Sequence, residues 1–211
     1  SNTVIIGQIL AATKKIKVGA GGVMLPNYSP LVVAEQYGTL AQFYPHRVDL
    51  GIGRAPGSDI NTVRALGSLG KSSTDFPREV SELLRYLKGD QDDLVKAIPA
   101  QDTTVPVWIL GTGLFGAELA AKLGLPYVFA SHFAPKMLED AIQVYRSNFT
   151  PSVHLSEPYF MMSVGLYAAD TDEEARRISS SIKLHFAELQ RGSVGKLAPP
   201  IHNIETFLDT D

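Results

Sequence analysis

Apolar residues recur along this chain at two spacings, which alternate from one segment to the next. Spacings of three and four residues predict amphipathic helices at residues 4–13, 30–43, 76–87, 113–123 and 135–149, and from residue 171 onward. Short alternating or continuously apolar runs predict strands at residues 16–25, 48–52, 105–110, 127–130 and 159–168. Residues 61–74, 89–104 and 191–203 show neither pattern and are assigned to no element.

Residues at the helix ends support these boundaries. Ser29 followed by Pro30 is typical of a helix start, because the fixed φ of proline suits the first helical position. Gly124 is placed to end the helix at residues 113–123. The acids of Thr171-Asp172-Glu173-Glu174 suit a helix N-terminus, where the helix dipole favours negative charge.

Strands that alternate with helices over short connections predict a parallel sheet built from βαβ units. An open doubly wound sheet and a TIM (β/α)8 barrel both fit this order. The barrel is favoured because glycine-rich or polar loops follow four successive strands, whereas a doubly wound sheet concentrates its ligand chemistry near one switch point. We expect one α/β barrel domain over residues 1–211, from which N-terminal strands and a C-terminal end are missing.

Composition limits the kind of partner. Charged residues make up 19% of the chain, hydrophobic residues 45%, and the formal net charge is -3. There is therefore no broad basic field for nucleic acid or an anionic membrane surface. The absence of cysteine excludes disulfides and thiolate chemistry, and no His, Asp or Glu cluster has metal-ligand spacing. No apolar run approaches the roughly 20 residues of a membrane span, and we expect a cytoplasmic protein without a metal.

The strand ends bring small and polar residues to one edge of the predicted sheet. In a parallel barrel the carboxyl ends of the strands open on the same face, where active sites lie. The four ends are Gly19-Ala20-Gly21-Gly22, Gly51-Ile52-Gly53-Arg54, Leu110-Gly111-Thr112-Gly113 and Ala130-Ser131-His132-Phe133. They predict a groove whose walls lack side chains, which suits a broad flat ligand lying against backbone.

The turn from Gly111 to Gly113 separates a strand from a helix start. Backbone N–H groups at such a helix N-terminus favour a phosphate group, although many short glycine turns are only tight turns. The turn is not a Walker loop, because no lysine follows the glycines at the required place. Gly111, Gly113 and Gly116 match the letters of the GxGxxG dinucleotide fingerprint, but His132 stands near the position where an acidic residue is expected. A dinucleotide site stays open as an alternative and is not preferred.

Arg54 and His132 are the candidate catalytic residues, and each has a structural alternative. A guanidinium at a strand end suits a phosphate or a carbonyl oxygen; the alternative is a salt bridge to Asp49 or Asp59. An imidazole there suits donation to a ligand or proton transfer; the alternative is a hydrogen bond inside the fold. Ser131 and His132 are adjacent on a strand and would point to opposite faces, which argues against a hydrolytic Ser–His pair.

Several ordered motifs resemble those of the luciferase-like monooxygenases, the flavin-dependent relatives of bacterial luciferase. The most specific is Arg47-Val-Asp-Leu-Gly-Ile-Gly-Arg-Ala-Pro-Gly-Ser-Asp59. The others are Val18-Gly-Ala-Gly-Gly-Val-Met-Leu-Pro-Asn-Tyr-Ser-Pro30, Ala34-Glu-Gln36, Pro106-Val-Trp-Ile-Leu-Gly111 and Gly124-Leu-Pro-Tyr-Val-Phe-Ala-Ser-His-Phe-Ala-Pro135. The resemblance extends from about residue 4 to about residue 187.

The resemblance implies a (β/α)8 barrel that binds reduced FMN, often as a homodimer, and inserts one oxygen atom of O2 into a small-molecule substrate. It also implies a separate flavin reductase as the source of the reduced cofactor. By match, Gly21 and Gly22 would lie under the isoalloxazine ring, where the family often has a non-proline cis peptide bond, and Thr112 and Gly113 would lie near the phosphate. The predicted cofactor-binding residues are Ala20, Gly21, Gly22, Gly53, Arg54, Leu110, Gly111, Thr112, Gly113 and Ser131.

The chain departs from the family pattern at three places. Family members begin with two more strands, which often carry a Glu-His-His segment beside the flavin, and they end with a further strand and helix. Gly113 stands where the family usually has a second serine beside the phosphate. Two alternatives therefore accompany the flavin monooxygenase: an F420-dependent oxidoreductase with the same barrel, and a non-catalytic flavin-binding partner subunit.

Overall fold

The computed structural model describes residues 2–55, 60–67, 73–89, 92–192 and 195–204. Contacts divide the chain into two compact units, Ser1–Ser163 and Val164–Asp211. The first unit contains the sheet and the second contains one long helix. Residues 56–59, the end of the motif that starts at Arg47, lie outside the described residues.

Five parallel strands form the sheet of the first unit in the order β1-β2-β3-β4-β5. Their bounds are Val18–Met24 for β1, Val48–Gly53 for β2, Val107–Gly111 for β3, Tyr127–Phe129 for β4 and Phe160–Met162 for β5. Each strand therefore pairs with the next one along the chain, whereas a doubly wound sheet reverses its strand order at a switch point. The order confirms the predicted TIM-barrel arrangement.

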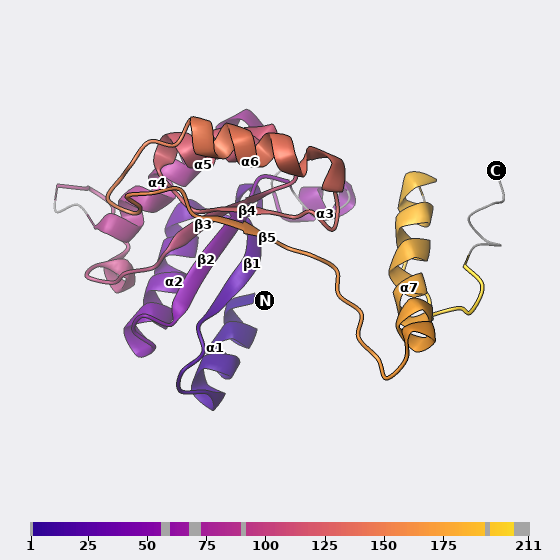
Figure 1. Cartoon of the computed structure of the whole chain (residues 1–211). Helices are drawn as coiled ribbons and strands as arrows, with labels where there is room; N and C mark the ends of the chain where they lie inside the picture. The colour runs from indigo at the N-terminus through magenta and orange to yellow at the C-terminus, as the bar shows by residue number, and fades with distance from the viewer. Residues whose placement is uncertain (1, 56–59, 68–72, 90–91, 193–194, 205–211) are drawn as a thin grey trace. The chain divides into compact units, whose positions relative to one another are not determined.

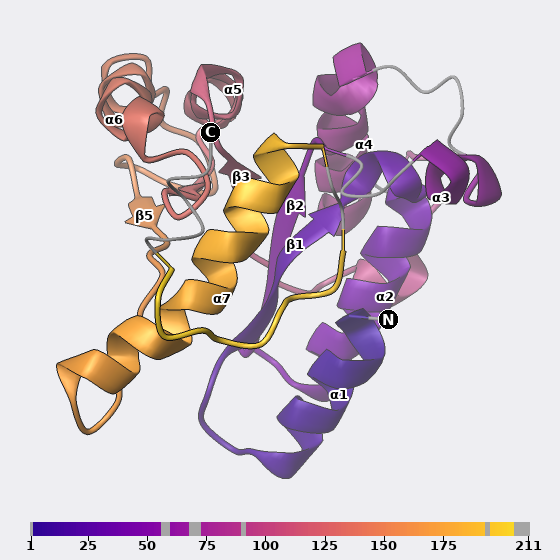
Figure 2. The same ribbon diagram turned by 90° about the vertical axis from the view of Figure 1, so that its right-hand side faces the viewer.

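Helices connect the strands. In the first unit they are α1 (Asn2–Ala12), α2 (Pro30–Phe43), α3 (Ile60–Ala65), α4 (Phe76–Lys88), α5 (Leu114–Leu123) and α6 (Leu138–Ser147), with 3-10 turns at Leu25–Asn27, Ser73–Asp75, Ile98–Ala100 and Pro135–Met137. Helix α2 packs beside α4, and α5 packs beside α6 against β3 and β4 (Figures 1 and 2).

The alternation of side chains along the strands separates a core side of the sheet from an open side. Leu50 and Ile52 of β2 and Ile109 of β3 are fully buried at 0% exposure and share one hydrophobic core with residues of the helices. The residues between them point the other way. Asp49 and Trp108 share that second side, since the indole Nε1 donates to the Asp49 carboxylate at 3.1 Å. In a (β/α)8 barrel this second side is the interior of the barrel.

Arg47, the first residue of the motif, has a structural role. Its guanidinium donates to the carbonyl oxygens of Leu10 at 3.3 Å, Thr13 at 2.9 Å and Ile16 at 2.8 Å. These carbonyls lie at the end of α1 and just after it, where a helix leaves C=O groups without intrahelical partners. A cation at this position also interacts favourably with the helix dipole. Arg47 thus joins the end of α1 to the start of β2.

Several elements differ from the prediction made from the pattern. Strand β5 is shorter than residues 159–168, because its partner β4 is only 3 residues long and the two pair over that length alone. Strand β3 begins at Val107 rather than at residue 105, since Pro106 has no N–H to contribute to the ladder. Residues 61–74, which were assigned to no element, contain most of α3.

The second unit is built around α7 (Asp172–Gln190). The Thr171 hydroxyl accepts a hydrogen bond from the Glu174 N–H at 3.2 Å, which confirms the predicted helix start. The Ser180 hydroxyl accepts one from the Ile201 N–H at 2.7 Å, and this bond attaches the segment that follows the helix. Within the described part of the chain, no helix has both the length and the hydropathy needed to cross a membrane.

Replacing Gly51 by alanine is expected to lower the free energy of unfolding by about 1–3 kcal/mol, the usual cost of overpacking. A Cβ at this position would lie 2.2 Å from the carbonyl oxygen of Ala20 and 2.7 Å from Cδ1 of Leu110. Strands β1 and β3 would therefore have to move away from β2. Urea unfolding followed by circular dichroism measures the change.

Gly7→Ala is the matched control for Gly51→Ala. A Cβ on Gly7 would lie 3.5 Å from Cδ2 of Leu40, an ordinary contact. Alanine also favours a helix interior over glycine by up to about 1 kcal/mol, so Gly7→Ala should raise stability. If Gly51→Ala were as stable as the wild-type protein, the close approach of β1 and β2 would be wrong.

Candidate functional site

A cavity of about 340 Å³ opens at the carboxyl ends of the strands. This volume falls within the range of small-molecule sites, roughly 300–1,000 Å³. The wall consists of glycines, one arginine, one threonine and apolar side chains: Gly21, Gly22, Met24, Gly53, Arg54, Ala55, Phe76, Ile109, Leu110, Gly111, Thr112, Gly113, Phe115, Gly116, Ala130 and Phe133. All of these residues belong to the first unit.

A larger hollow, of about 620 Å³, lies at the opposite end of the strands. It is lined by the C-terminal part of α4, by residues 103–105 before β3 and by Val153 and His154 before β5. In parallel barrels the amino ends of the strands contribute stability, and the carboxyl ends carry the chemistry. The cavity at the carboxyl ends is therefore the candidate site.

The structure brings most of the predicted cofactor-binding residues to this wall. Gly21 and Gly22 come from β1, Gly53 and Arg54 from the end of β2, and residues 110–113 from the end of β3. Ala20 lies one residue before the lining part of β1 and packs against the core. Ser131 and His132 are not part of the wall, although their neighbours Ala130 and Phe133 are.

The glycines of the wall differ in their surroundings. A Cβ on Gly21 or Gly113 would have no heavy atom within 4 Å apart from its chain neighbours, so both positions face open space. A Cβ on Gly22 would lie 2.9 Å from the carbonyl oxygen of Gly51, so this glycine allows β1 to approach β2. The peptide bond between Gly21 and Gly22 is cis, in agreement with the bond that the family resemblance implies.

Tyr127 explains two further glycines of the wall, Gly111 at the end of β3 and Gly116 in α5. A Cβ on Gly111 would lie 3.1 Å from the Tyr127 hydroxyl oxygen, and a Cβ on Gly116 would lie 3.1 Å from Cε2 of the same ring. The hydroxyl donates to the carbonyl oxygen of Gly113 at 3.0 Å. Burial raises the pKa of this phenol, which therefore remains a protonated donor at neutral pH. Gly111 and Gly116 make room for the Tyr127 side chain. Packing therefore accounts for two of the three glycines that match the GxGxxG pattern.

The N-terminus of α5 borders the cavity. Gly113 is its N-cap residue and no side chain caps the helix there, while Phe115 and Gly116 of the first turn line the wall. The first N–H groups of a helix have no intrahelical acceptor and favour an anion. The first turn contains no acidic residue that would repel one. This end of the cavity suits a phosphate group.

Arg54 carries the only charge among the described residues of the wall. Its guanidinium carbon lies 4.3 Å from the centre of the Phe115 ring, within the range of a cation–π contact. Phe115 belongs to the first turn of α5, so the contact holds the cation beside the helix N-terminus. Of the two proposed ion-pair partners, Asp49 accepts from Trp108 and Asp59 lies outside the described residues.

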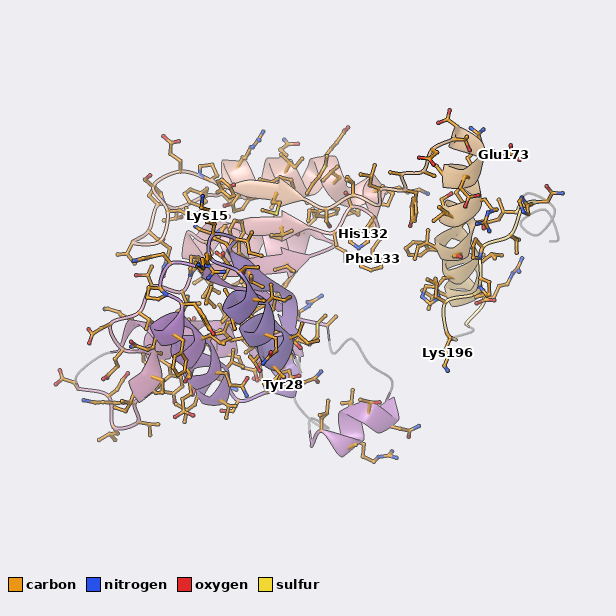
Figure 3. All side chains as sticks on the ribbon, turned by 90° about the horizontal axis from the view of Figure 1, so that it is seen from below. Lys15, Tyr28, His132, Phe133, Glu173 and Lys196 are labelled. Atoms are coloured by element: carbon orange, nitrogen blue, oxygen red, sulfur yellow. The ribbon has the colours of Figure 1, made fainter. Side chains whose placement is uncertain are left out.

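Ser131 and His132 lie beside the cavity, and both contact Ser163. The Ser131 hydroxyl donates to the Ser163 carbonyl oxygen at 2.5 Å, and Nδ1 of His132 lies 3.0 Å from the Ser163 hydroxyl oxygen. The His132 ring also lies against Phe133, with 4.0 Å between ring centroids, and Figure 3 shows these two side chains next to each other. Strand β4 ends at Phe129, so Ser131 and His132 lie in the turn that follows it and are not strand residues with opposite faces, as the argument against a hydrolytic pair assumed.

Sequence reasoning missed the three aromatic residues of the wall. Phe76 is buried, Phe115 is 36% exposed and Phe133 is 61% exposed. A phenylalanine directly after a predicted strand end was the available signal for Phe133, because a large apolar side chain exposed beside a cavity often marks a ligand site. Among the described residues, no three His, Asp or Glu side chains are grouped in a way that could hold a metal ion.

Solved structures share this fold. The crystal structure of apo-MsnO8 matches with a TM-score of 0.88 and 36% sequence identity, over 100% of this chain and 63% of that one. The oxygenating constituent of 3,6-diketocamphane monooxygenase from Pseudomonas putida, in complex with FMN, matches with a TM-score of 0.64 and 18% identity, over 91% and 60%. An F420-dependent secondary alcohol dehydrogenase has a TM-score of 0.62 and 20% identity, over 99% and 66%. The last two show the fold alone.

Related sequences identify the family of this chain. A luciferase-like monooxygenase of Escherichia coli (strain K12) is 48% identical over 209 residues, 98% of this chain and 62% of that protein. The uncharacterized protein YvbT of Bacillus subtilis (strain 168) is 48% identical over 207 residues, 97% of this chain and 62% of its own length. This chain thus spans less than two thirds of these relatives. Because the match to the luciferase-like monooxygenase family covers residues 1–200, the chain belongs to that family.

Proposed function

We propose that this protein is an FMN-dependent monooxygenase, which uses reduced FMN and O2 to oxygenate a small organic substrate. The observation that carries the proposal is the make-up of the cavity wall, which combines open backbone at Gly21 with the Arg54 cation beside the N-terminus of α5. A ligand that joins a flat ring to a phosphate fits such a wall, and family membership supports the same function.

The phosphate end would be held by charge and by backbone donors. Arg54 would supply a charge-assisted hydrogen bond, which is stronger than a neutral one. The N–H groups of the first turn of α5 would supply further donors, since Gly113 leaves them uncapped. The Thr112 hydroxyl lines the same wall and adds a donor. Gly113 offers no hydroxyl where the family usually has serine, so the backbone must supply that contact.

The ring end would be held by close approach and by apolar contact. With no Cβ at Gly21, the isoalloxazine ring can lie against the backbone of β1. Ile109, Leu110 and Phe76 give this part of the wall an apolar surface that excludes water. When bound, reduced FMN supplies the electrons that activate O2. The residues described here then contribute binding, orientation and exclusion of water.

F420 is the alternative cofactor, because the same fold occurs in an F420-dependent enzyme. We also propose a small-molecule substrate, a separate flavin reductase that supplies the reduced cofactor, a homodimeric assembly and a cytoplasmic location. A non-catalytic partner subunit is the remaining alternative. It would bind flavin without consuming O2 and would form a stable heterodimer.

A cofactor titration tests the proposed function. The full-length protein is titrated with FMN and, separately, with F420, and binding is followed by the change in cofactor fluorescence. We expect FMN to bind at micromolar concentrations or below, and O2 to be consumed when reduced FMN and a substrate are supplied. A preference for F420, or no binding of FMN at micromolar concentrations, would contradict the proposal. Bound FMN without O2 consumption would favour the partner-subunit alternative.

Arg54→Ala is expected to weaken FMN binding by more than tenfold while leaving thermal unfolding similar. A hydrogen bond to a charged group contributes about 1.5–3 kcal/mol, which corresponds to roughly a tenfold to hundredfold change in affinity. The exposed side chain of Arg54 contributes little to the core, so stability should change little. Arg146→Ala, an exposed arginine in the last turn of α6, is the control and should leave affinity unchanged. If Arg54→Ala lowered thermal stability and left FMN affinity unchanged, Arg54 would have a structural role instead.

Tyr127→Phe is expected to weaken the binding of FMN more than the binding of riboflavin, which has no phosphate. The change removes the hydrogen bond that orients the Gly113 carbonyl at the N-terminus of α5. It should also lower the free energy of unfolding by about 1 kcal/mol. Isothermal calorimetry gives the two affinities and urea unfolding gives the stability.

Tyr86→Phe is the control for Tyr127→Phe. The Tyr86 hydroxyl donates to the Glu82 carboxylate at 3.2 Å on α4, a partly buried bond that water can replace. We expect no change in either affinity and at most a small change in stability. If Tyr127→Phe reduced FMN and riboflavin binding by the same factor, the phosphate assignment at Gly113 would be wrong.

A further inference from the structure

The carbonyl oxygen of Phe129 is already occupied by two backbone donors. The N–H groups of Ser131 and Ser163 both donate to it, each at 3.0 Å. A carbonyl oxygen has two lone pairs, and these two bonds use both. The Ser163 hydroxyl lies 3.3 Å from the same oxygen and 3.0 Å from Nδ1 of His132. The hydroxyl proton therefore has its better acceptor in the histidine ring.

This arrangement favours one tautomer of His132 over the other. When the Ser163 hydroxyl donates to Nδ1, that nitrogen must carry a lone pair, and a neutral imidazole then has its proton on Nε2. With the proton on Nδ1 instead, the Ser163 hydroxyl would have to donate to the carbonyl oxygen of Phe129, whose two lone pairs already accept from backbone N–H groups. The contacts of Ser163 therefore favour Nε2 as a hydrogen-bond donor rather than an acceptor.

Ser163 is itself held firmly enough to orient the ring. Its N–H bonds to Phe129, and its carbonyl oxygen accepts from the hydroxyl of Ser131, which is 8% exposed. Phe133 packs against the imidazole and also lines the cavity. Among the hydrogen bonds of the described residues, the His132 ring takes part through Nδ1 alone, so its Nε2–H is free to donate to a ligand.

We propose that His132 donates its Nε2–H to an oxygen atom of the molecule bound in the cavity, and that Ser163 is the positioning residue for this donor. The proposal rests on the proposed flavin function, because it needs a ligand at the strand ends. A ring carbonyl of the flavin and a carbonyl of the substrate have the acceptor chemistry required. His132 would then stabilise negative charge on that oxygen and would not act as a base through Nε2.

The first test is the proton position in the full-length chain without cofactor. Histidine labelled with 15N shows the protonated ring nitrogen in a multiple-bond proton–nitrogen spectrum, and loss of one signal set in His132→Gln assigns His132. We expect the proton on Nε2 at neutral pH in the wild-type chain, and a mixture of both tautomers in Ser163→Ala. A proton on Nδ1 in the wild-type chain would overturn the proposal, whether or not FMN binds.

The second test locates the acceptor. FMN is titrated into the wild-type chain, His132→Phe and His132→Gln, and cyclohexanone is then titrated into each FMN-loaded chain. Loss of a neutral hydrogen bond should weaken binding of the accepting molecule by roughly three- to tenfold in His132→Phe. His132→Gln keeps an N–H near the position of Nε2 and should restore most of the affinity.

The outcomes of the second test are distinct. A selective loss of FMN affinity identifies the flavin as the acceptor. A selective loss of cyclohexanone affinity, with methylenecyclohexane unaffected, identifies a substrate carbonyl. Unchanged affinity for both in His132→Phe would overturn the donor role. Failure of the wild-type chain to bind FMN would contradict the proposed function, and the tautomer of His132 would still be measured in the same protein.

Discussion

A buried phenol needs a hydrogen-bond acceptor, and the acceptor of Tyr127 connects the core of this protein to its site. The ring is fully buried and packs against Phe129, Tyr145 and Phe160. An unpaired hydroxyl there would cost about 1–3 kcal/mol. The carbonyl oxygen of Gly113 removes that cost and fixes the turn between β3 and α5 to the middle of the sheet. A Cβ on Gly111 of β3 or on Gly116 of α5 would lie 3.1 Å from the same side chain, so core packing and site shape depend on one residue.

Much of the fold could be predicted from sequence, because it depends on local periodicity and on strand direction. Branched apolar residues at a two-residue spacing identify β2, and the helical spacing of α4 identifies its buried face. Once the strands are parallel, their ends must share a face, so the strand-end residues could be grouped before their positions were known. The short helix α3 and the early end of β5 were missed. Their lengths depend on neighbouring segments rather than on their own pattern.

The site was predicted less completely, because glycine has several causes that look alike in a sequence. Gly51 is required by the carbonyl oxygen of Ala20, and Gly113 leaves open space beside a helix N-terminus. Both appear in the sequence only as a missing side chain. The contacts that distinguish them join residues far apart along the chain. The placement of Arg54 over Phe115 and the bond between Trp108 and Asp49 have the same long-range origin. No pattern of three or four residues can report them.

The distribution of charge in the cavity suggests how chemistry is divided between protein and cofactor. Among the described residues of the wall only Arg54 is charged, and it lies beside the N-terminus of α5. The other described residues of the wall are uncharged, and apart from Thr112 they are glycine or apolar. An apolar wall strengthens any polar contact made inside it, because water is excluded and the local dielectric is low. If His132 donates into the cavity as proposed, this one hydrogen bond would therefore have a large effect on a ligand oxygen. Under the proposed function, the cation would select the ligand by its phosphate, and the uncharged remainder of the wall would leave reactivity to the cofactor.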